Sequence, residues 1–194
     1  MLLSSCVGFG TKFDTPSDEI LALGKLTPTD ALKQFGQPYG KTTKATKEGN
    51  YLTYSYYFAV NNFGTLSSRL LLLEFKENSL NGYYWWSSFK QDKTIVNQDN
   101  FGKLQAGIGK LTKADVLALA GKPNAKAHCP TLIAEFKEDC DKNTEVWGWY
   151  MQEQVAVGVA KTPKSLELTV AFDADGKVSS VETTELDNLQ RTRI

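Results

Sequence analysis

The reactive side chains that stand out in this chain are His128, Cys129 and Cys140, which lie close together in the segment HCPTLIAEFKEDC. Ten residues separate the two cysteines, and this spacing suits a local disulfide in an oxidising compartment. Two reduced thiols in a polar loop are the alternative interpretation. A zinc site formed by all three residues is disfavoured, because no fourth ligand is evident and the chain contains only one histidine.

The pattern of polar residues gives little support for an enzyme. Nucleophilic catalysis by serine or cysteine would require His128 as the base, inside the predicted cysteine loop. No Gly-x-Ser-x-Gly elbow and no glycine-rich phosphate loop occurs in the sequence. The acidic cluster of Glu135, Glu138, Asp139 and Asp141 is typical of a solvated loop rather than of paired catalytic carboxylates. We therefore predict a non-enzymatic protein that uses no metal and no cofactor.

The composition excludes two further classes of function. Basic and acidic residues both total 22, so the sequence contains no basic footprint for nucleic acid. No apolar run reaches the roughly 18 to 20 residues that a membrane-spanning helix needs. With 194 residues, the chain is long enough for one large domain or two small ones.

A third cysteine, Cys6, ends the segment LLSSC near the start of the chain. This segment resembles the lipobox of bacterial lipoproteins, in which a cysteine after small residues is lipidated and becomes the mature N-terminus. The resemblance implies a lipid anchor at Cys6. In such lipoproteins an aspartate directly after the cysteine signals retention in the inner membrane. Val7 occupies that position here, so the resemblance implies an outer-membrane lipoprotein that faces the periplasm. Only five residues precede Cys6, which is less than a complete signal sequence.

A segment that occurs twice in the chain predicts the main helices. GKLTPTDALKQFGQP begins at Gly24, and GKLTKADVLALAGKP begins at Gly109, with eight identities in fifteen positions. Each copy has a threonine N-cap, an aspartate three residues later, an apolar helical face, and then glycine and proline as stop signals. Each copy therefore predicts a two-turn helix. The residues before it, 17–23 and 101–108, suggest a further short helix in each half.

Similar strands follow each copy of the repeated segment. Residues 53–58 align with 146–151, residues 71–75 align with 168–172, and last strands are expected at 83–89 and 178–184. We therefore predict an α+β fold of two tandem repeats, each a short helix-loop-helix packed on a three- to four-stranded antiparallel sheet. The expected organisation is an N-terminal signal remnant and tether, a first repeat, a second repeat and a C-terminal tail, at residues 1–16, 17–92, 99–187 and 188–194.

Period-two alternation assigns the two faces of these strands. One face, containing Tyr54, Tyr56, Trp147 and Trp149, is expected to line the core. The other face is expected to stay open and to bind a partner protein, since tyrosine and tryptophan are favoured at interfaces. The residues predicted for partner binding are Tyr57, Leu70, Leu72, Tyr84, Trp86 and Tyr150.

The second half of the chain, with GKLTKADVLALAGKP, WGWY and LTVAFDADGKVSSVE, resembles the BamE family (SmpA/OmlA) of small outer-membrane lipoproteins. Tandem copies of such a unit resemble the β-lactamase inhibitory protein (BLIP)-like fold, in which two repeats form a saddle-shaped sheet that grips a partner protein. A small disulfide loop beside the helices also occurs in that fold, as Cys129 and Cys140 would provide here. The resemblance covers residues 17–187 and is stronger in the second half.

This resemblance implies a lipid-anchored envelope protein that binds a protein partner, either in outer-membrane assembly or as an inhibitor of a hydrolase such as a β-lactamase. A fold alone does not establish either activity. An aromatic sheet could also bind a small ligand or a cell-wall glycan, and this alternative stays open.

Overall fold

We describe a computed structural model that covers residues 7–62, 65–92, 94–128, 145–157 and 160–187. Contacts divide the chain into two compact units. The first contains residues 1–92 and 126–144, and the second contains 93–125 and 145–194. None of the helices in the described part of the chain has the length and apolar character needed for a bilayer crossing. Cys6, Cys129, Cys140 and the acidic cluster lie outside the described residues, so the disulfide and lipidation remain predictions.

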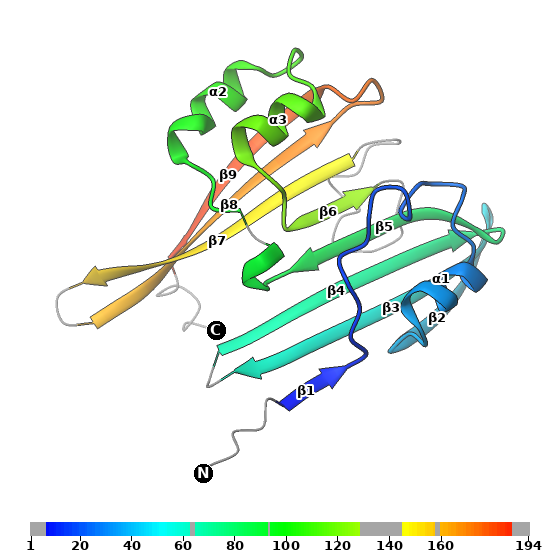
Figure 1. Ribbon diagram of the computed structural model, residues 1–194. Helices are drawn as coiled ribbons and strands as arrows, with labels where there is room; N and C mark the ends of the chain where they lie inside the picture. Colours follow the sequence, from blue (N-terminus) through cyan, green and yellow to red (C-terminus); the bar gives the residue numbers. More distant parts are fainter. Residues whose placement is uncertain (1–6, 63–64, 93, 129–144, 158–159, 188–194) are drawn as a thin grey trace, which may run out of the picture. The chain divides into compact units, whose positions relative to one another are not determined.

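The first unit is an antiparallel sheet with one helix against one face (Figure 1). Its elements in the first ninety-two residues are β1 (Val7–Gly10), α1 (Pro28–Phe35), β2 (Gly40–Thr46), β3 (Gly49–Asn62), β4 (Thr65–Lys76), β5 (Ser79–Ser87) and the 3-10 turn η1 (Lys90–Asp92). β4 lies between β3 and β5, while β1 and β2 pair with opposite halves of the other edge of β3. The short β6 (Ala125–His128) lies next to β5.

The second unit places two helices against a three-stranded sheet (Figure 1). Its elements are the 3-10 turn η2 (Gln98–Asn100), α2 (Phe101–Ala106), α3 (Lys113–Ala120), β7 (Glu145–Val157), β8 (Ala160–Phe172) and β9 (Val178–Asp187). β8 pairs with β7 on one side and with β9 on the other, antiparallel in both cases.

The two predicted helix starts and stops are confirmed. Thr27 caps α1 by accepting a hydrogen bond from the Asp30 backbone N–H, and Thr112 forms a reciprocal capping box with Asp115 before α3. Gly36 and Gly121 end the two helices at φ values of 77° and 72°. These positive angles favour glycine, which explains its recurrence in the repeated segment.

The glycine and leucine that open the repeated segment connect each helix to a strand. In the first unit, the Gly24 N–H donates to the Leu80 carbonyl and the Leu80 N–H donates to the Leu26 carbonyl, both at 2.8 Å. In the second unit, Gly109 and Leu111 make the same pair of bonds with Val178, at 2.8 and 2.9 Å. The repeated residues thus specify the contact between the helix start and the sheet.

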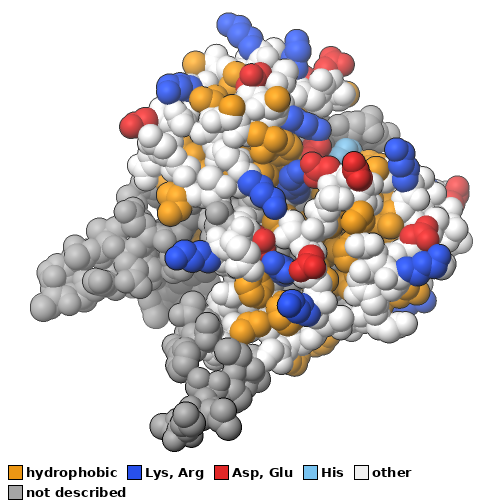
Figure 2. Space-filling view, viewed as in Figure 1, with side chains coloured by type: hydrophobic (Ala, Val, Ile, Leu, Met, Phe, Trp, Pro, Cys, Tyr) orange, Lys and Arg blue, Asp and Glu red, His pale blue; other side chains and the backbone are white. Residues whose placement is uncertain are grey.

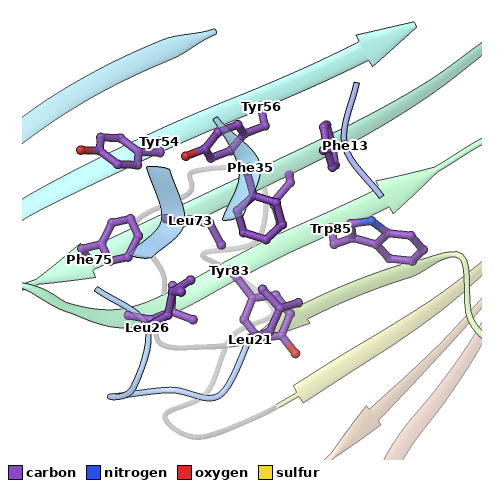
Figure 3. Close-up of a cluster of buried hydrophobic side chains, with 13 residues drawn as sticks. Phe13, Leu21, Leu26, Phe35, Tyr54, Tyr56, Leu73, Phe75, Tyr83 and Trp85 are labelled. Atoms are coloured by element: carbon purple, nitrogen blue, oxygen red, sulfur yellow. The ribbon is translucent and has the colours of Figure 1, made fainter. Parts of the chain in front are cut away.

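Each unit has its own aromatic core on the face that its helices cover. In the first unit, Phe35 from α1 lies against Tyr56 of β3, with ring centroids 5.5 Å apart, and Phe13 lies 6.3 Å from both rings (Figure 3). In the second unit, Trp147 and Trp149 of β7 lie in the core, and the ring centroids of Trp147 and Phe172 are 4.7 Å apart. The predicted core face of these strands is confirmed.

The predicted fold class is wrong. The structure is dominated by antiparallel strands and has three short α-helices among its described residues, and it does not contain two helix-loop-helix repeats. Residues 17–23 form turns instead of a helix, because the segment reaches Gly24, at φ 74°, within a few residues and then binds β5. The extra strands β1, β2 and β6 enlarge the sheet beyond the predicted three or four strands.

Candidate functional site

The candidate site is the face of the first unit's sheet opposite α1. Two rows of side chains cross β3, β4 and β5 on this face. The first row joins Tyr57, Leu70 and Trp86, which are direct register partners. The second joins Ser55, Leu72 and Tyr84 in the same way. All six side chains are half-buried, and all except Ser55 are aromatic or aliphatic, so these rows form a largely apolar surface that is partly accessible to solvent.

Three strongly exposed apolar residues extend this face. Phe9 of β1 is 57% exposed, and its ring centroid lies 6.2 Å from that of Tyr57. Tyr39 is 69% exposed and lies 6.1 Å from Phe9. Leu66 is 62% exposed and shares the face of Leu70, because β3 and β4 pair without a register shift there.

We call these residues, without the polar Ser55, the apolar face. Its members are Phe9, Tyr39, Tyr57, Leu66, Leu70, Leu72, Tyr84 and Trp86. Five of them were predicted from the sequence, and Phe9, Tyr39 and Leu66 were not. The signal for Phe9 was weak, since the flanking glycines in VGFG do not suggest a strand.

The apolar face has a polar end. Glu74 of β4 continues the alternation of Leu70 and Leu72, and its carboxylate is buried. The Asn81 side-chain amide donates to Glu74 Oε1 at 2.9 Å, where β5 departs from regular register. The register partner of Glu74 on β5 is Gly82. Among the residues that the structure describes, this face combines an apolar surface with one buried acid and holds no nucleophile–base pair.

A buried ion pair fixes the strands at the other end of the face. Arg69 and Asp92 have side chains that are 8% and 6% exposed, and Arg69 Nε lies 2.8 Å from Asp92 Oδ2. Arg69 Nη1 also donates to the Phe13 carbonyl at 2.6 Å, while Ser87 and Thr15 donate to Asp92 at 2.6 and 3.0 Å. Sequence reasoning missed this network, because its members are far apart along the chain.

This network positions the first row of the apolar face. Arg69 and Ser87 are register partners, and they are the chain neighbours of Leu70 and Trp86. Burial by itself would raise the pKa of Asp92, but hydrogen bonds from Ser87, Arg69 and Thr15, together with the Arg69 charge, hold that pKa below its ordinary value. Asp92 is therefore the ionised partner of a cation inside the fold.

On the corresponding face of the second unit, the described side chains next to Tyr150 are polar. Tyr150 is half-buried on β7, opposite Glu167, and its backbone N–H donates to Asn124 Oδ1 at 2.8 Å. Thr169 and Glu182 are the next register partners on this face. The structure thus places Tyr150 in a different unit from the other five predicted residues, and on a face of different chemistry. A partner-binding role for Tyr150 stays a prediction.

The remaining sequence candidates do not assemble a catalytic or metal site in the described residues. His128 ends β6, half-buried, with its ring centroid 6.1 Å from that of Tyr83. No cluster of three or more histidine, cysteine, aspartate or glutamate residues that could hold a metal ion occurs in the described ranges. On the side of the molecule drawn in Figure 2, acidic and basic side chains are interspersed.

Comparison with known proteins gives one weak structural similarity. No family model matches the chain, and no curated protein matches it. A solved structure from Streptococcus mutans, described as a "putative beta-lactamase inhibitor protein", is 12% identical, with a TM-score of 0.49. The match covers 81% of this chain and 82% of that one. A similarity at this level establishes neither a shared family nor a shared function, so the resemblance to BamE proteins stays an expectation from the motifs.

Proposed function

We propose that this protein is a non-enzymatic binding module that holds a folded partner protein on the apolar face of its first unit. The observation that carries the proposal is the continuous row of Tyr57, Leu70 and Trp86, which the exposed Phe9 and Leu66 extend. Contiguous exposed apolar surface is uncommon on monomers and usually marks a binding site. Tyrosine and tryptophan lose little conformational entropy when they are buried, so they serve well as anchors.

A rigid sheet suits this function. The row is carried by three long, paired strands, and the Arg69–Asp92 network joins the ends of β4 and β5 beneath it. Little side-chain and backbone freedom would then be lost on binding, which favours affinity. The polar face of the second unit supports a primary contact through the first unit.

The partner that we propose is an envelope protein. LLSSC motivates lipidation at Cys6 and an outer-membrane location facing the periplasm. Within that compartment, a component of outer-membrane assembly and a hydrolase of β-lactamase type are the two partner classes that the sequence motifs suggest. Metabolic labelling with a clickable fatty acid tests the anchor: the natural gene should give a labelled protein, and Cys6→Ser should abolish the label.

The experiment that tests the proposed function is a crosslinked pull-down from native envelope extract, followed by reconstitution with the purified captured protein. Tyr57→Ala and Trp86→Ala should lose the capture. Ile95→Ser serves as the matched control, because Ile95 is a strongly exposed apolar residue of the second unit. Support requires both a reconstituted complex and its loss in the two face variants.

Two outcomes would contradict the proposal. Capture that survives both face variants would place the interface elsewhere. Saturable binding of a purified glycan or small ligand that Trp86→Ala removes, with no protein captured, would favour the alternative ligand-binding function, because aromatic rings also stack on sugars and apolar groups.

A further inference from the structure

β2 is an exposed edge of the first unit's sheet (Figure 1). It has seven residues, and the five in its middle are exposed. Among the described strands it pairs only with β3, so its outer row of backbone N–H and C=O groups has no strand partner there. A row of this kind is a template for another strand.

The positive charge of this edge disfavours pairing with a second copy of the chain. Lys41 and Lys44 lie on β2 and Lys47 follows it, with Glu48 as the acidic residue of the hairpin turn. None of these lysines forms an ion pair with the described residues, whereas Glu48 accepts a hydrogen bond from Tyr51 Oη at 3.4 Å. Pairing β2 with the same strand of a second copy would bring like charges together, which disfavours self-association through this edge.

A groove lies beside β2 on the helix side of the sheet. Its volume is about 450 Å³. Pro28 at the start of α1 forms one side, Lys41 and Thr43 of β2 form the other, and Leu52 and the buried Phe75 contribute apolar surface. An added strand would project alternate side chains to this side of the sheet, from where a large apolar side chain could reach across β2 into the groove.

We propose that β2 is a second interaction surface, which takes up an extended acidic segment of a partner protein as an added antiparallel strand. Backbone hydrogen bonds would supply most of the affinity. Carboxylates opposite Lys41 and Lys44 would select the segment, and an apolar side chain opposite Thr43 would enter the groove. This surface is distinct from the apolar face, so it stands independently of the proposed function.

The test uses a fluorescent synthetic peptide, Thr-Val-Glu-Phe-Thr-Glu-Thr, and measures binding to the full chain by anisotropy. In an antiparallel pair its two glutamates fall opposite Lys44 and Lys41, and its phenylalanine falls opposite Thr43. Binding should weaken as salt is raised. Lys41→Glu/Lys44→Glu should weaken it by roughly ten-fold, because two exposed ion pairs become repulsive.

Three controls separate this mechanism from others. Lys103→Glu/Lys110→Glu makes the same charge change on exposed residues of the second unit and should leave binding intact. Trp86→Ala should also leave it intact, since Trp86 belongs to the apolar face. A peptide of the same sequence that is N-methylated at every residue keeps its charges but cannot pair as a strand, and it should not bind.

Several results would overturn the proposal. These are equal binding of the N-methylated peptide, equal binding by Lys41→Glu/Lys44→Glu, and no binding of the parent peptide at millimolar concentration. A concentration-dependent dimer of the wild-type chain that binds no parent peptide would also overturn it, because β2 would then be occupied by a second copy.

Discussion

Replacement of Asp92 by alanine should destabilise the first unit more than any change on its exposed surface. Among the described residues, Asp92 is the only buried carboxylate that contacts Arg69, because the second carboxylate, Asp14 at 3.9 Å, is almost fully exposed. Asp92→Ala removes the carboxylate and leaves the guanidinium inside the fold. It also removes the acceptor of the Ser87 and Thr15 hydroxyls.

The expected loss follows from these contacts. Removing one partner of a buried ion pair typically lowers the free energy of unfolding by about 3 to 5 kcal/mol. Arg69 would keep its bond to the Phe13 carbonyl, and its guanidinium carbon would still lie 4.7 Å from the Phe89 ring centroid. Because these contacts partly compensate, we expect the lower end of the range, about 3 kcal/mol.

Urea unfolding followed by tryptophan fluorescence measures this loss. Asp99→Ala is the matched control, since Asp99 is an exposed aspartate of η2, and it should change the free energy of unfolding by less than about 0.5 kcal/mol. Asp92→Ala/Arg69→Met should recover part of the loss, because no unpaired charge remains buried. If Asp92→Ala costs less than about 1 kcal/mol, the pair is not a buried constraint and the reasoning fails.

The same pair predicts how stability depends on pH. The folded-state pKa of Asp92 lies below its ordinary value, so the unfolded chain binds a proton at this site more readily. The stabilisation from Asp92 is therefore complete above the unfolded pKa of about 3.9 and is lost as the pH falls from there through the folded pKa. In Asp92→Ala this part of the acid dependence should be absent.

Further predictions concern Tyr56 and two helix-flanking glycines. The Tyr56 hydroxyl is buried without a hydrogen-bond partner among the described residues, so Tyr56→Phe should leave stability unchanged or raise it by up to about 1 kcal/mol in urea unfolding. Burial, followed by the neighbouring Tyr54, raises the pKa of Tyr56 to about 12, so wild-type stability should fall as the pH rises from about 10 towards that value, and Tyr56→Phe should remove this loss. Gly121→Ala should lower stability by about 2 kcal/mol or more, because φ is positive and the new Cβ would meet Thr94 Cγ2 at 2.4 Å. Gly109→Ala, at a similar φ but with open space, should lose about 1 kcal/mol; equal losses at both glycines would refute the steric argument.

The parts of the fold that the sequence predicted are those with local signals. Thr112 and Asp115 specify a helix start within four residues, and Gly121 specifies its end, so α3 was predictable without tertiary information. Successive side chains of a strand point to opposite faces. Tyr54 and Tyr56 could therefore be assigned to one face of β3 and Tyr57 to the other from the sequence alone.

The parts that the sequence did not predict depend on contacts between distant residues. β2 is polar and exposed on both faces, so its sequence, GKTTKAT, carries no alternation to detect. Arg69 and Asp92 are 23 positions apart, and the bond to the Phe13 carbonyl spans 56 positions. Residues 17–23 were expected to form a helix, but their backbone hydrogen bonds form turns, and the Gly24 N–H donates to Leu80 of β5. Tertiary contacts decided each of these cases.

The central claim is that the apolar face binds a protein, and isothermal titration of the purified, captured partner tests it most directly. Wild type would be compared with Tyr57→Ala, Trp86→Ala and Tyr150→Ala, after circular dichroism has shown that each variant is folded. We predict that either change on the apolar face weakens binding by about 2 kcal/mol, or roughly 30-fold, as for buried aromatic anchors. Tyr150→Ala should change it little. Unchanged affinity in both face variants would contradict the account.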